Sequence, residues 1–410
     1  MKNMFLALRH RNFRLFFIGQ AVSLIGFWMQ NTAQSWLVYD LTKPDSSFWL
    51  GLIGFMGSLP VLLFSLFGGA VADRIPKRPL ILGLQSILML LALALGLLTF
   101  FVLIKLWHVA FLALLLGLVN AFEMPARQSF IVEMVGKKNL GNAIALNATM
   151  FNSARLIGGG LTGILMVSMG AGICFLVNSA SYLAVITSLL FMKLLPLQKV
   201  EKPSSIFQST LDGLRYIRHT PPVLALVVLV GIMTIFGWSY SVLMPIFADQ
   251  ILGAGPGGLG WLVSCNGMGA LTAGLTLAAI HNGVRPRVLS FTGIGIFCVS
   301  VTALALSRVF WLSALCMVFV GFGLVTFFAT SNITLQRWVP DNMRGRVMGI
   351  YSFVFIGFFP LGSLQAGMLA HLTSAPIAVF CGAVVCAVAT LTLGRFAGKD
   401  SAAPPSPDIS

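Results

Sequence analysis

Long runs of apolar residues, separated by short polar segments, dominate the pattern along the chain. A helix needs roughly 20 consecutive apolar residues to cross the hydrocarbon core of a bilayer. The runs of this chain predict twelve such helices, at residues 12–41, 48–72, 79–104, 108–134, 140–167, 173–195, 221–250, 257–280, 287–307, 309–336, 344–371 and 375–396. The runs are continuous rather than alternating, which excludes a transmembrane β-barrel. The pattern predicts an all-α membrane protein.

Composition supports this fold class. The 410 residues are 58% hydrophobic and 9% charged, with a mean hydropathy of +0.94. Soluble domains carry about 25% charged residues, so a soluble fold of this chain would have too little polar surface. The basic start, MKNMFLALRHRNFR, leads into an apolar run too long for a signal peptide, and no cleavable signal is expected.

The distribution of positive charge predicts the topology. The net charge is +15, from 26 lysines and arginines against 11 acids. With a cytoplasmic N-terminus, three of the 26 (Lys43, Lys105 and Arg308) lie outside and two (Arg127 and Arg155) lie within spans, which leaves 21 inside. The positive-inside rule therefore predicts that both termini are cytoplasmic. The basicity is explained by topology, and no nucleic-acid partner is expected.

A hydrophilic stretch from Leu197 to Pro222 divides the spans six and six. It predicts an N-terminal six-helix bundle at residues 1–196, a cytoplasmic linker with an interfacial helix at 197–222, and a C-terminal six-helix bundle at 223–398. The Pro/Ser-rich tail at 399–410 is expected to be disordered.

The two halves also resemble each other in sequence. Shifts of 204 and 209 residues superpose glycines of one half on glycines of the other: Gly158 on Gly362, Gly163 on Gly367 and Gly51 on Gly260. Equivalent loops fall on the same side of the membrane, which indicates a parallel repeat of six-helix units. Transporters built in this way bind their substrate between the halves near the midplane.

The loop after the second span reads GGAVADRIPKRPL, at 68–80. It resembles the loop signature of the major facilitator superfamily, G-x-L-A-D-R-x-G-R-K/R. The resemblance implies a cytoplasmic gate formed by Gly69, Asp73, Arg74, Lys77 and Arg78. It also implies that Asp73 latches the two halves together, against the start of the eleventh span near Arg344.

A wider resemblance covers essentially the whole chain. Its segments are FRLFFIGQAVSLIGFWMQNTAQSWLVYDLT, FEMPARQSFIVEMVGKKNLGNAIALNATMFNSARLIGG and RYIRHTPPV. They resemble the enterobactin-exporter and drug-efflux branch of the superfamily, which implies two pseudo-symmetric six-helix bundles that work by alternating access. One departure is the fifth span, which carries Gly158–Gly160 where this branch commonly has Gly-Pro. This change leaves open whether the fifth span bends at this point and in which direction the protein transports its substrate.

Three charged residues lie at membrane depth. Glu123 and Arg127 are one helical turn apart in the fourth span, and Arg155 lies near the middle of the fifth. An isolated charge at the bilayer centre costs about 2.5–3.5 kcal/mol, so the three are expected to form a network. Either the network is static, or Glu123 loses its arginine partner in one conformation and takes up a proton.

Several uncharged polar or aromatic residues at membrane depth are candidates for a substrate cavity. They are Gln30, Asn31, Gln34, Asn120, Trp238, Tyr240, Asn332 and Tyr351. Each is equally suited to a hydrogen bond between helices, which is worth about 0.6–2 kcal/mol.

Other classes of function fit less well. GPGGLG at 255–260 matches a dinucleotide-binding glycine motif but follows no predicted strand. The five histidines and six cysteines are scattered, so no metal, cofactor or enzymatic activity is expected. We therefore expect a monomeric transporter of a bacterial inner membrane, a proton-coupled exporter of an amphipathic small molecule such as a siderophore or drug. The alternatives are a lysophospholipid flippase or uptake carrier of the same fold and, from another class, a non-transporting membrane sensor.

Overall fold

A computed structural model describes residues 6–192, 206–280 and 286–394. Its helices are η1 (Leu6–Arg9), α1 (Arg11–Leu41), α2 (Ser46–Arg74), α3 (Lys77–Phe100), α4 (Leu106–Met169), α5 (Ala171–Leu190), α6 (Ile206–His219), α7 (Pro221–Ile232), η2 (Met233–Gly237), η3 (Trp238–Leu243), α8 (Met244–Ile246), η4 (Phe247–Ile251), α9 (Gly255–Ile280), α10 (Pro286–Leu306), α11 (Phe310–Trp338), α12 (Asp341–Gly357), α13 (Phe359–Leu372) and α14 (Ala375–Leu393).

Twelve segments within these helices are long and apolar enough to cross a membrane, and each overlaps one predicted span. The fourth and fifth spans run together in α4, which breaks at Gly136, where φ is +67° and glycine is favoured. We call Leu106–Gly136 the first leg of α4 and Asn139–Met169 its second leg. The predicted all-α membrane fold is confirmed.

Two other spans are irregular. The seventh passes from α7 through π and 3-10 turns (η2, η3 and η4) and through one short α-helical turn, α8, which contains Pro245. The eleventh is divided at Phe358 into α12 and α13, and Pro360 lies in the first turn of α13. Proline removes a backbone donor and clashes with the preceding turn, which explains a break at each position.

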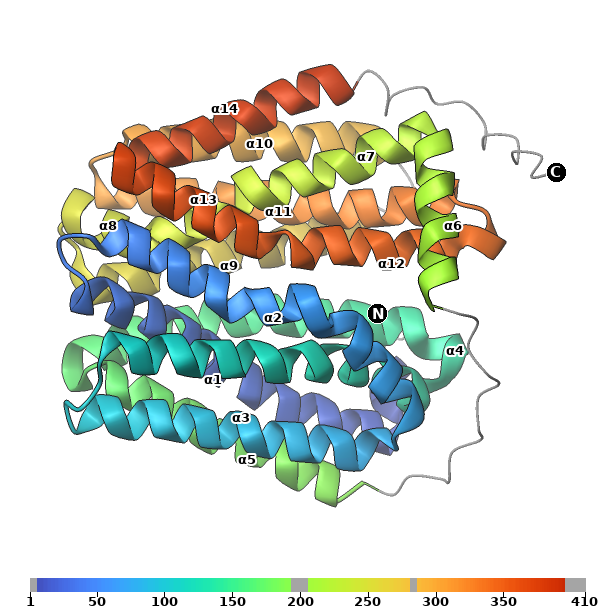
Figure 1. The fold of residues 1–410 in the computed structure, drawn as a ribbon, viewed down its shortest axis with the longest axis horizontal. Coiled ribbons are helices and arrows are strands. Elements are labelled where there is room, and N and C mark those ends of the chain that lie inside the picture. The colour runs from blue at the N-terminus through green and yellow to red at the C-terminus, as the bar shows by residue number, and fades with distance from the viewer. Residues whose placement is uncertain (1–5, 193–205, 281–285, 395–410) are drawn as a thin grey trace.

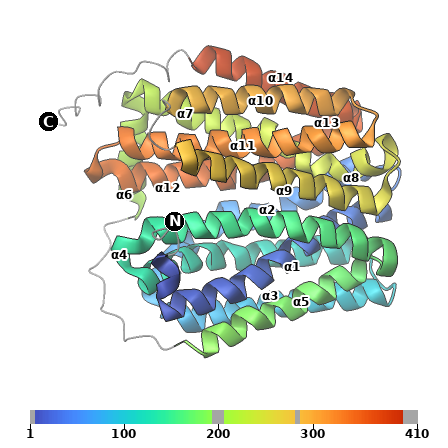
Figure 2. The ribbon, with the colours of Figure 1, turned by 180° about the vertical axis from the view of Figure 1, so that it is seen from behind.

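The spans form two six-helix halves (Figures 1 and 2). The first half is α1–α5 and the second is α7–α14, while α6 lies across one end of the molecule (Figure 1). We call this the α6 end, and the opposite one the far end. Asp212 of α6 pairs with Arg346 of α12 at 3.1 Å, so α6 is attached to the second half. Residues 197–205 of the predicted linker and the predicted tail lie outside the described residues.

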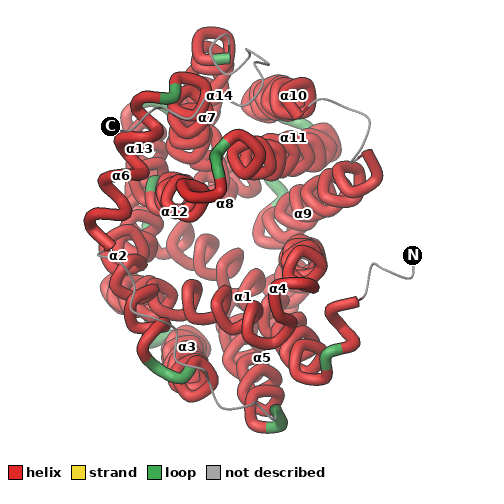
Figure 3. The backbone as a smooth tube through the Cα atoms, turned by 90° about the vertical axis from the view of Figure 1, so that its right-hand side faces the viewer, coloured by secondary structure: helices red, strands yellow, loops and turns green. Residues whose placement is uncertain are grey.

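Two seams join the halves. Seen from the α6 end, α4 meets α9 on one side and α2 meets α12 and α13 on the other (Figure 3). In the α4–α9 seam, a Cβ on Gly260 would lie 2.4 Å from the nitrogen of Gly163. In the α2–α13 seam, a Cβ on Gly51 would lie 2.7 Å from the Cα of Gly367. Only glycine allows backbones this close.

The glycine pairs that the sequence repeat superposes occupy equivalent contacts. Gly163 faces Gly260 in one seam, and their counterparts Gly367 and Gly51 face each other in the other seam. Likewise Gly158 packs on Ile25 and Trp28 of α1, whereas its counterpart Gly362 packs on Ile235 of the seventh span. The structure therefore realises the pseudo-symmetry that the repeat predicted.

The tight contacts of both seams lie toward the far end. Toward the α6 end, a Cβ on Gly274 of α9 or on Gly345 or Gly349 of α12 would meet no heavy atom within 4 Å. The halves are thus closely packed at the far end and diverge toward the α6 end.

Candidate functional site

Glu123 lies near the middle of the first leg of α4, with 3% of its surface exposed. Its Oε1 accepts a hydrogen bond from Nε2 of Gln85 at 3.1 Å, and Nε of Arg127 lies 3.5 Å from the same oxygen. The structure therefore places Arg127 beside Glu123, one helical turn away. Gln85, on α3, was not among the sequence candidates, although a glutamine inside the run LGLQSIL is a signal that could have identified it.

Arg155, the expected third member of the charge network, lies elsewhere. Its Nη1 donates to Oδ1 of Asn266 at 2.9 Å, and its guanidinium carbon lies 4.3 Å from the centre of the Trp28 ring. Among the described residues, the ion pair of Glu123 is with Arg127 and none joins it to Arg155. The reason is that Arg155 faces α9 across the α4–α9 seam, whereas Glu123 faces α3 inside the first half.

The Arg155 contact continues into the second half. Nδ2 of Asn266 donates to the hydroxyl of Tyr240 at 2.9 Å, and all three side chains are buried. This chain of contacts, Trp28–Arg155–Asn266–Tyr240, connects α1 and α4 of one half with α9 and η3 of the other.

A cavity of about 160 Å³ lies between the halves, between α2, the first leg of α4, and α12. Its lining is mostly apolar, with polar groups contributed by Ser65, Asn120, Gln128 and Ser352. Asn120, Met124 and Gln128 recur at four-residue spacing and so form one stripe of α4. Glu123 lies outside that stripe, which explains why it contacts α3 instead of the cavity.

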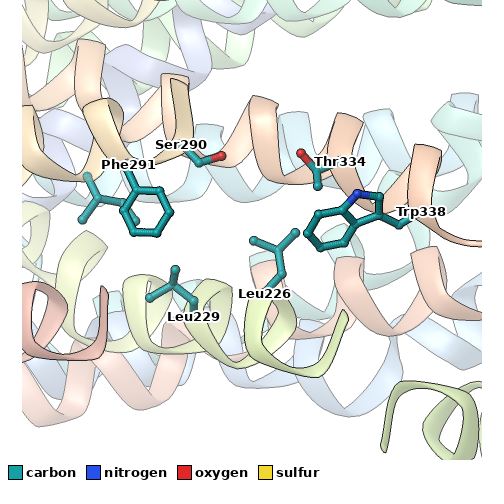
Figure 4. Close-up of a pocket in the computed structure, with 7 residues that line it drawn as sticks. Leu226, Leu229, Ser290, Phe291, Thr334 and Trp338 are labelled. Carbon is teal, nitrogen blue, oxygen red and sulfur yellow. The ribbon is translucent and has the colours of Figure 1, made fainter. Parts of the chain in front are cut away.

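A second cavity, of about 30 Å³, lies within the second half beside Leu226, Phe291, Thr334 and Trp338 (Figure 4). A space of this size admits about one water molecule. It is too small for a substrate of the expected kind.

The other predicted cavity residues take several positions. Gln30 accepts a 2.6 Å hydrogen bond from Asn178 within the first half, and Tyr351 donates to the carbonyl of Phe328 at 3.1 Å. Trp238 packs among aromatic rings, including Phe355 at 5.4 Å between ring centres. The remaining members are Asn31 (exposed), Gln34 (half-buried) and Asn332 (a hydrogen-bond acceptor for Gln336). Of the predicted set, Asn120 lines the larger cavity.

The predicted gate motif contacts its own half. Nζ of Lys77 pairs with Glu133, at the end of the first leg of α4, at 2.5 Å, and Nη2 of Arg78 donates to the carbonyl of Leu190 at 2.9 Å. Asp73 and Arg74 are exposed, and Gly69 is half-buried. Within the described part of the chain, no hydrogen bond or ion pair joins Asp73 to α12, and Arg344 pairs with Asp341 instead.

A polar cluster joins the halves at the far end. The hydroxyl of Tyr39 donates to Oδ2 of Asp249 at 2.6 Å, and Nζ of Lys43 lies 3.2 Å from the same oxygen. Nζ of Lys43 also lies 3.3 Å from Asp40 and over the ring of Tyr39, at 4.5 Å. We call Tyr39, Lys43 and Asp249 the far-end latch, because they connect α1 and the turn that follows it to η4.

The charge of Lys43 is stable at neutral pH. Partial burial lowers the pKa of Lys43, but its contacts with Asp249 and Asp40 outweigh that effect and raise the pKa above the ordinary value. A lysine whose folded-state pKa is raised contributes stability that is lost only as pH rises through that pKa. The latch therefore does not open through Lys43 near neutral pH.

Comparison with known proteins gives a consistent result. The profile of a family described as transmembrane secretion effectors matches residues 3–404. The multidrug efflux pump Tap of Mycolicibacterium fortuitum is 26% identical, covering 86% of each chain. The staphyloferrin A transporter of Staphylococcus aureus is 24% identical over 87% of this chain and 89% of its own. The enterobactin exporter EntS of Salmonella choleraesuis is 25% identical over 96% of this chain and 95% of its own.

Solved structures share the fold. A bacterial homologue of the lysosomal transporter Spinster superposes with a TM-score of 0.76 at 13% identity, covering 97% of this chain and 99% of its own. A mutant of the nucleoside transporter NupG superposes with a TM-score of 0.70 at 11% identity, covering 93% of this chain and 99% of its own.

Proposed function

Because the chain belongs to the transmembrane secretion effector family of the major facilitator superfamily, a family of transporters and not of enzymes, we propose that it is a proton-coupled exporter. The proposed cargo is an amphipathic small molecule, a siderophore or a drug, carried by alternating access. Its relatives include a drug efflux pump, a staphyloferrin A transporter and enterobactin exporters.

The proposed orientation places the α6 end in the cytoplasm. The excess of lysine and arginine in the loops at this end supports it through the positive-inside rule. The far end, closed by two glycine seams and the far-end latch, then faces outward. The structure would thus be the inward-facing state of the cycle, in which the Asp73 gate is open.

The observation that carries the proposal is the environment of Glu123. It is the one acid near the middle of a membrane span among the described residues, and it is buried between Arg127 and Gln85. In the state described here, Arg127 compensates the negative charge of Glu123. If a rearrangement of α4 removed Arg127, the buried carboxylate would lose its counter-charge, and the protonated form would be favoured.

Gln85 is suited to both forms of Glu123. Its amide nitrogen donates to the carboxylate in this state, while its amide oxygen is buried without a partner. A protonated Glu123 becomes a donor, and a half-turn of the Gln85 amide presents that oxygen as the acceptor. Proton uptake therefore need not leave the new Glu123 hydroxyl without an acceptor, a defect that costs about 1–3 kcal/mol.

The cavity between the halves is the proposed cargo site. It shares the first leg of α4 with Glu123, since Asn120 and Met124 line the cavity and flank the acid in sequence. A cargo that moves this leg would thereby also act on the Glu123–Arg127 pair. Through this shared helix, the cargo and the proton can each shift the same conformational equilibrium, which coupling requires.

Transport in proteoliposomes under an imposed pH gradient tests the proposal. Ethidium and dansylglycine serve as amphipathic probes, one cationic and one anionic, and a fluorescent lysophosphatidylethanolamine represents the lipid alternative. We expect an inside-acid gradient to drive accumulation of ethidium or dansylglycine by the unmodified protein. Glu123→Gln should abolish the response, and the exposed-loop variant Asp45→Asn should retain it.

Each alternative predicts a different result. Accumulation by Glu123→Gln in response to the gradient would show that Glu123 is not the coupling site. Movement of the lysolipid alone would favour a flippase, for which the position of the cavity between α2 and α12 is the supporting observation. Uptake driven by an inside-alkaline gradient would indicate a symporter, and no transport of any probe would favour the sensor.

A further inference from the structure

Among the residues that the structure describes, Arg155 is a buried cation without an acidic partner. It is 7% exposed, and its contacts are the amide oxygen of Asn266 and the rings of Trp28 and Phe151. Glu123, the one acid at comparable depth among the described residues, is engaged by Arg127. Hydrogen bonding to an amide and cation–π contact reduce the cost of burying a charge, but they do not neutralise it.

Two buried donors at this position have no acceptor within the described part of the chain. Nε of Arg155 and Nε1 of Trp28 both lack a hydrogen-bond partner, and the guanidinium lies 4.3 Å from the centre of the Trp28 ring. The nearby amide nitrogen of Asn266 is already used, because it donates to Tyr240. The surroundings of Arg155 therefore offer unused N–H groups and positive charge, which together are complementary to an oxyanion.

The pseudo-symmetry shows that closing a seam does not require this cation. Adding 204 to 155 gives Phe359, and subtracting 209 from 266 gives Gly57, so the equivalent positions beside the α2–α13 seam are apolar. That seam brings its glycines as close together as the α4–α9 seam does. A structural role alone leaves the charge of Arg155 unexplained.

Arg155 also lies at the boundary between the two halves. Gly267 of α9 packs on the backbone of Arg155 and Leu156. Two turns closer to the α6 end, a Cβ on Gly274 would have no heavy atom within 4 Å. Arg155 is thus at the last tightly packed level of the seam, next to the point where the halves diverge. A ligand bound there would contact α1 and α4 on one side and α9 on the other.

We propose that Arg155 and Trp28 form a binding site for an oxyanion carried on an apolar body, such as the carboxylate of an aromatic acid. This inference rests on the proposed transport function, specifies its cargo as anionic, and adds a contact for the cargo at the α4–α9 seam, separate from the cavity lined by α2 and α12. The guanidinium and the indole N–H would bind the oxyanion, and the rings of Trp28 and Phe151 would contact the apolar body. A lipid headgroup phosphate offers the same oxyanion chemistry as a carboxylate.

Equilibrium binding of matched probes to the purified full-length protein tests the site. The probes are dansylglycine and its neutral twin dansylglycinamide, whose emission increases in an apolar environment. We expect the unmodified protein to prefer the carboxylate by roughly ten- to hundredfold, the range for hydrogen bonds to charged groups. Lysophosphatidylglycerol is the competitor: strong displacement of dansylglycine assigns the site to a lipid headgroup, and weak displacement to a free acid.

The decisive variant is Asn266→Asp. It keeps Arg155 and the 2.9 Å contact but supplies a carboxylate from within the protein. We expect it to melt no lower than the unmodified protein and to lose the preference for dansylglycine while still binding the neutral twin. Arg155→Gln should lose the same preference, and the exposed Arg337→Gln should keep it.

Several results would overturn the inference. They are equal affinity of the unmodified protein for both probes, no binding of either probe, or a full preference retained in Asn266→Asp. The outcome is separable from that of the proposed function. A preference that depends on Arg155 in a protein without gradient-driven transport supports the site alone. Gradient-driven ethidium transport without any such preference supports the transport function alone.

Discussion

Gly260→Ala is expected to shift the protein toward the state in which the far end is open. Gly260 lies in the α4–α9 seam, and a Cβ there would approach three backbone atoms: the nitrogen of Gly163 at 2.4 Å, its Cα at 2.5 Å and the carbonyl oxygen of Gly159 at 2.6 Å. Ordinary van der Waals contact begins near 3.4 Å. Backbone atoms cannot rotate away, so α4 and α9 must separate by about 1 Å.

The free-energy cost follows from that separation. Overpacking of a close interface costs about 1–3 kcal/mol, and each 1.4 kcal/mol changes an equilibrium about tenfold. The strain exists only while the seam is closed, so the equilibrium should move toward the far-end-open state by roughly 5- to 150-fold. A protein with about 1% of molecules open would then have roughly 5–60% open.

Distance measurement between two spin labels tests this shift. Labels at Asp45 and Arg308, introduced as cysteines in a background without the native ones, report on the far end because these exposed residues lie in loops of opposite halves. Gly274→Ala is the matched control, since it also replaces a glycine of α9 but meets no atom within 4 Å. A longer-distance population should grow in Gly260→Ala only. Identical distance distributions in the two variants would refute the role of the seam in closure.

Two further predictions concern polar groups. Asp249→Asn removes the charge that holds Tyr39 and Lys43, so the same spin-label pair should show more of the open population. The exposed Asp40→Asn is the control and should change little, because surface pairs contribute about 0–1 kcal/mol. Equal effects of the two variants would contradict the role of the far-end latch. Gln85→Leu removes the partner of Glu123, so gradient-driven uptake in proteoliposomes should fall by roughly tenfold, while Ser86→Ala, whose hydroxyl bonds only within α3, should transport normally. A fully active Gln85→Leu would show that Glu123 needs no such partner.

The arrangement of the spans could be predicted because a single local property determines it. Each span needs about 20 apolar residues whatever its neighbours are, so the sequence indicated all twelve. The Glu123–Arg127 pair could be predicted for the same reason, since a spacing of four residues brings two side chains together on any helix.

Contacts between spans that are distant in sequence could not be predicted. Arg155 was grouped with Glu123 because their helices are consecutive, but the side chain faces α9, more than 100 residues away in sequence. The glycine run Gly158–Gly160 also reflects contacts between spans that are distant in sequence. Gly158 packs on α1, and Gly159 packs on Gly260 and Ser264 of α9. Adjacent glycines therefore allow this helix to approach two different helices closely. That explains a run of glycines where a Gly-Pro bend was expected.

The pseudo-symmetry separates the residues that close the far end from the charged residues proposed to act in transport. The glycines of the two seams are equivalent in position and contact, so closure of the far end is shared by both halves. The charges are not shared: adding 204 to the positions of Glu123, Arg127 and Arg155 gives Phe327, Ser331 and Phe359 in the second half. A repeat that keeps its packing residues and differs in its charged ones does not need those charges to fold, because the second half forms the same bundle without them. Variants of these three residues should therefore change coupling and cargo preference more than they change the melting temperature, and variants of the seam glycines should change the balance between the closed and open far end more than they change cargo preference.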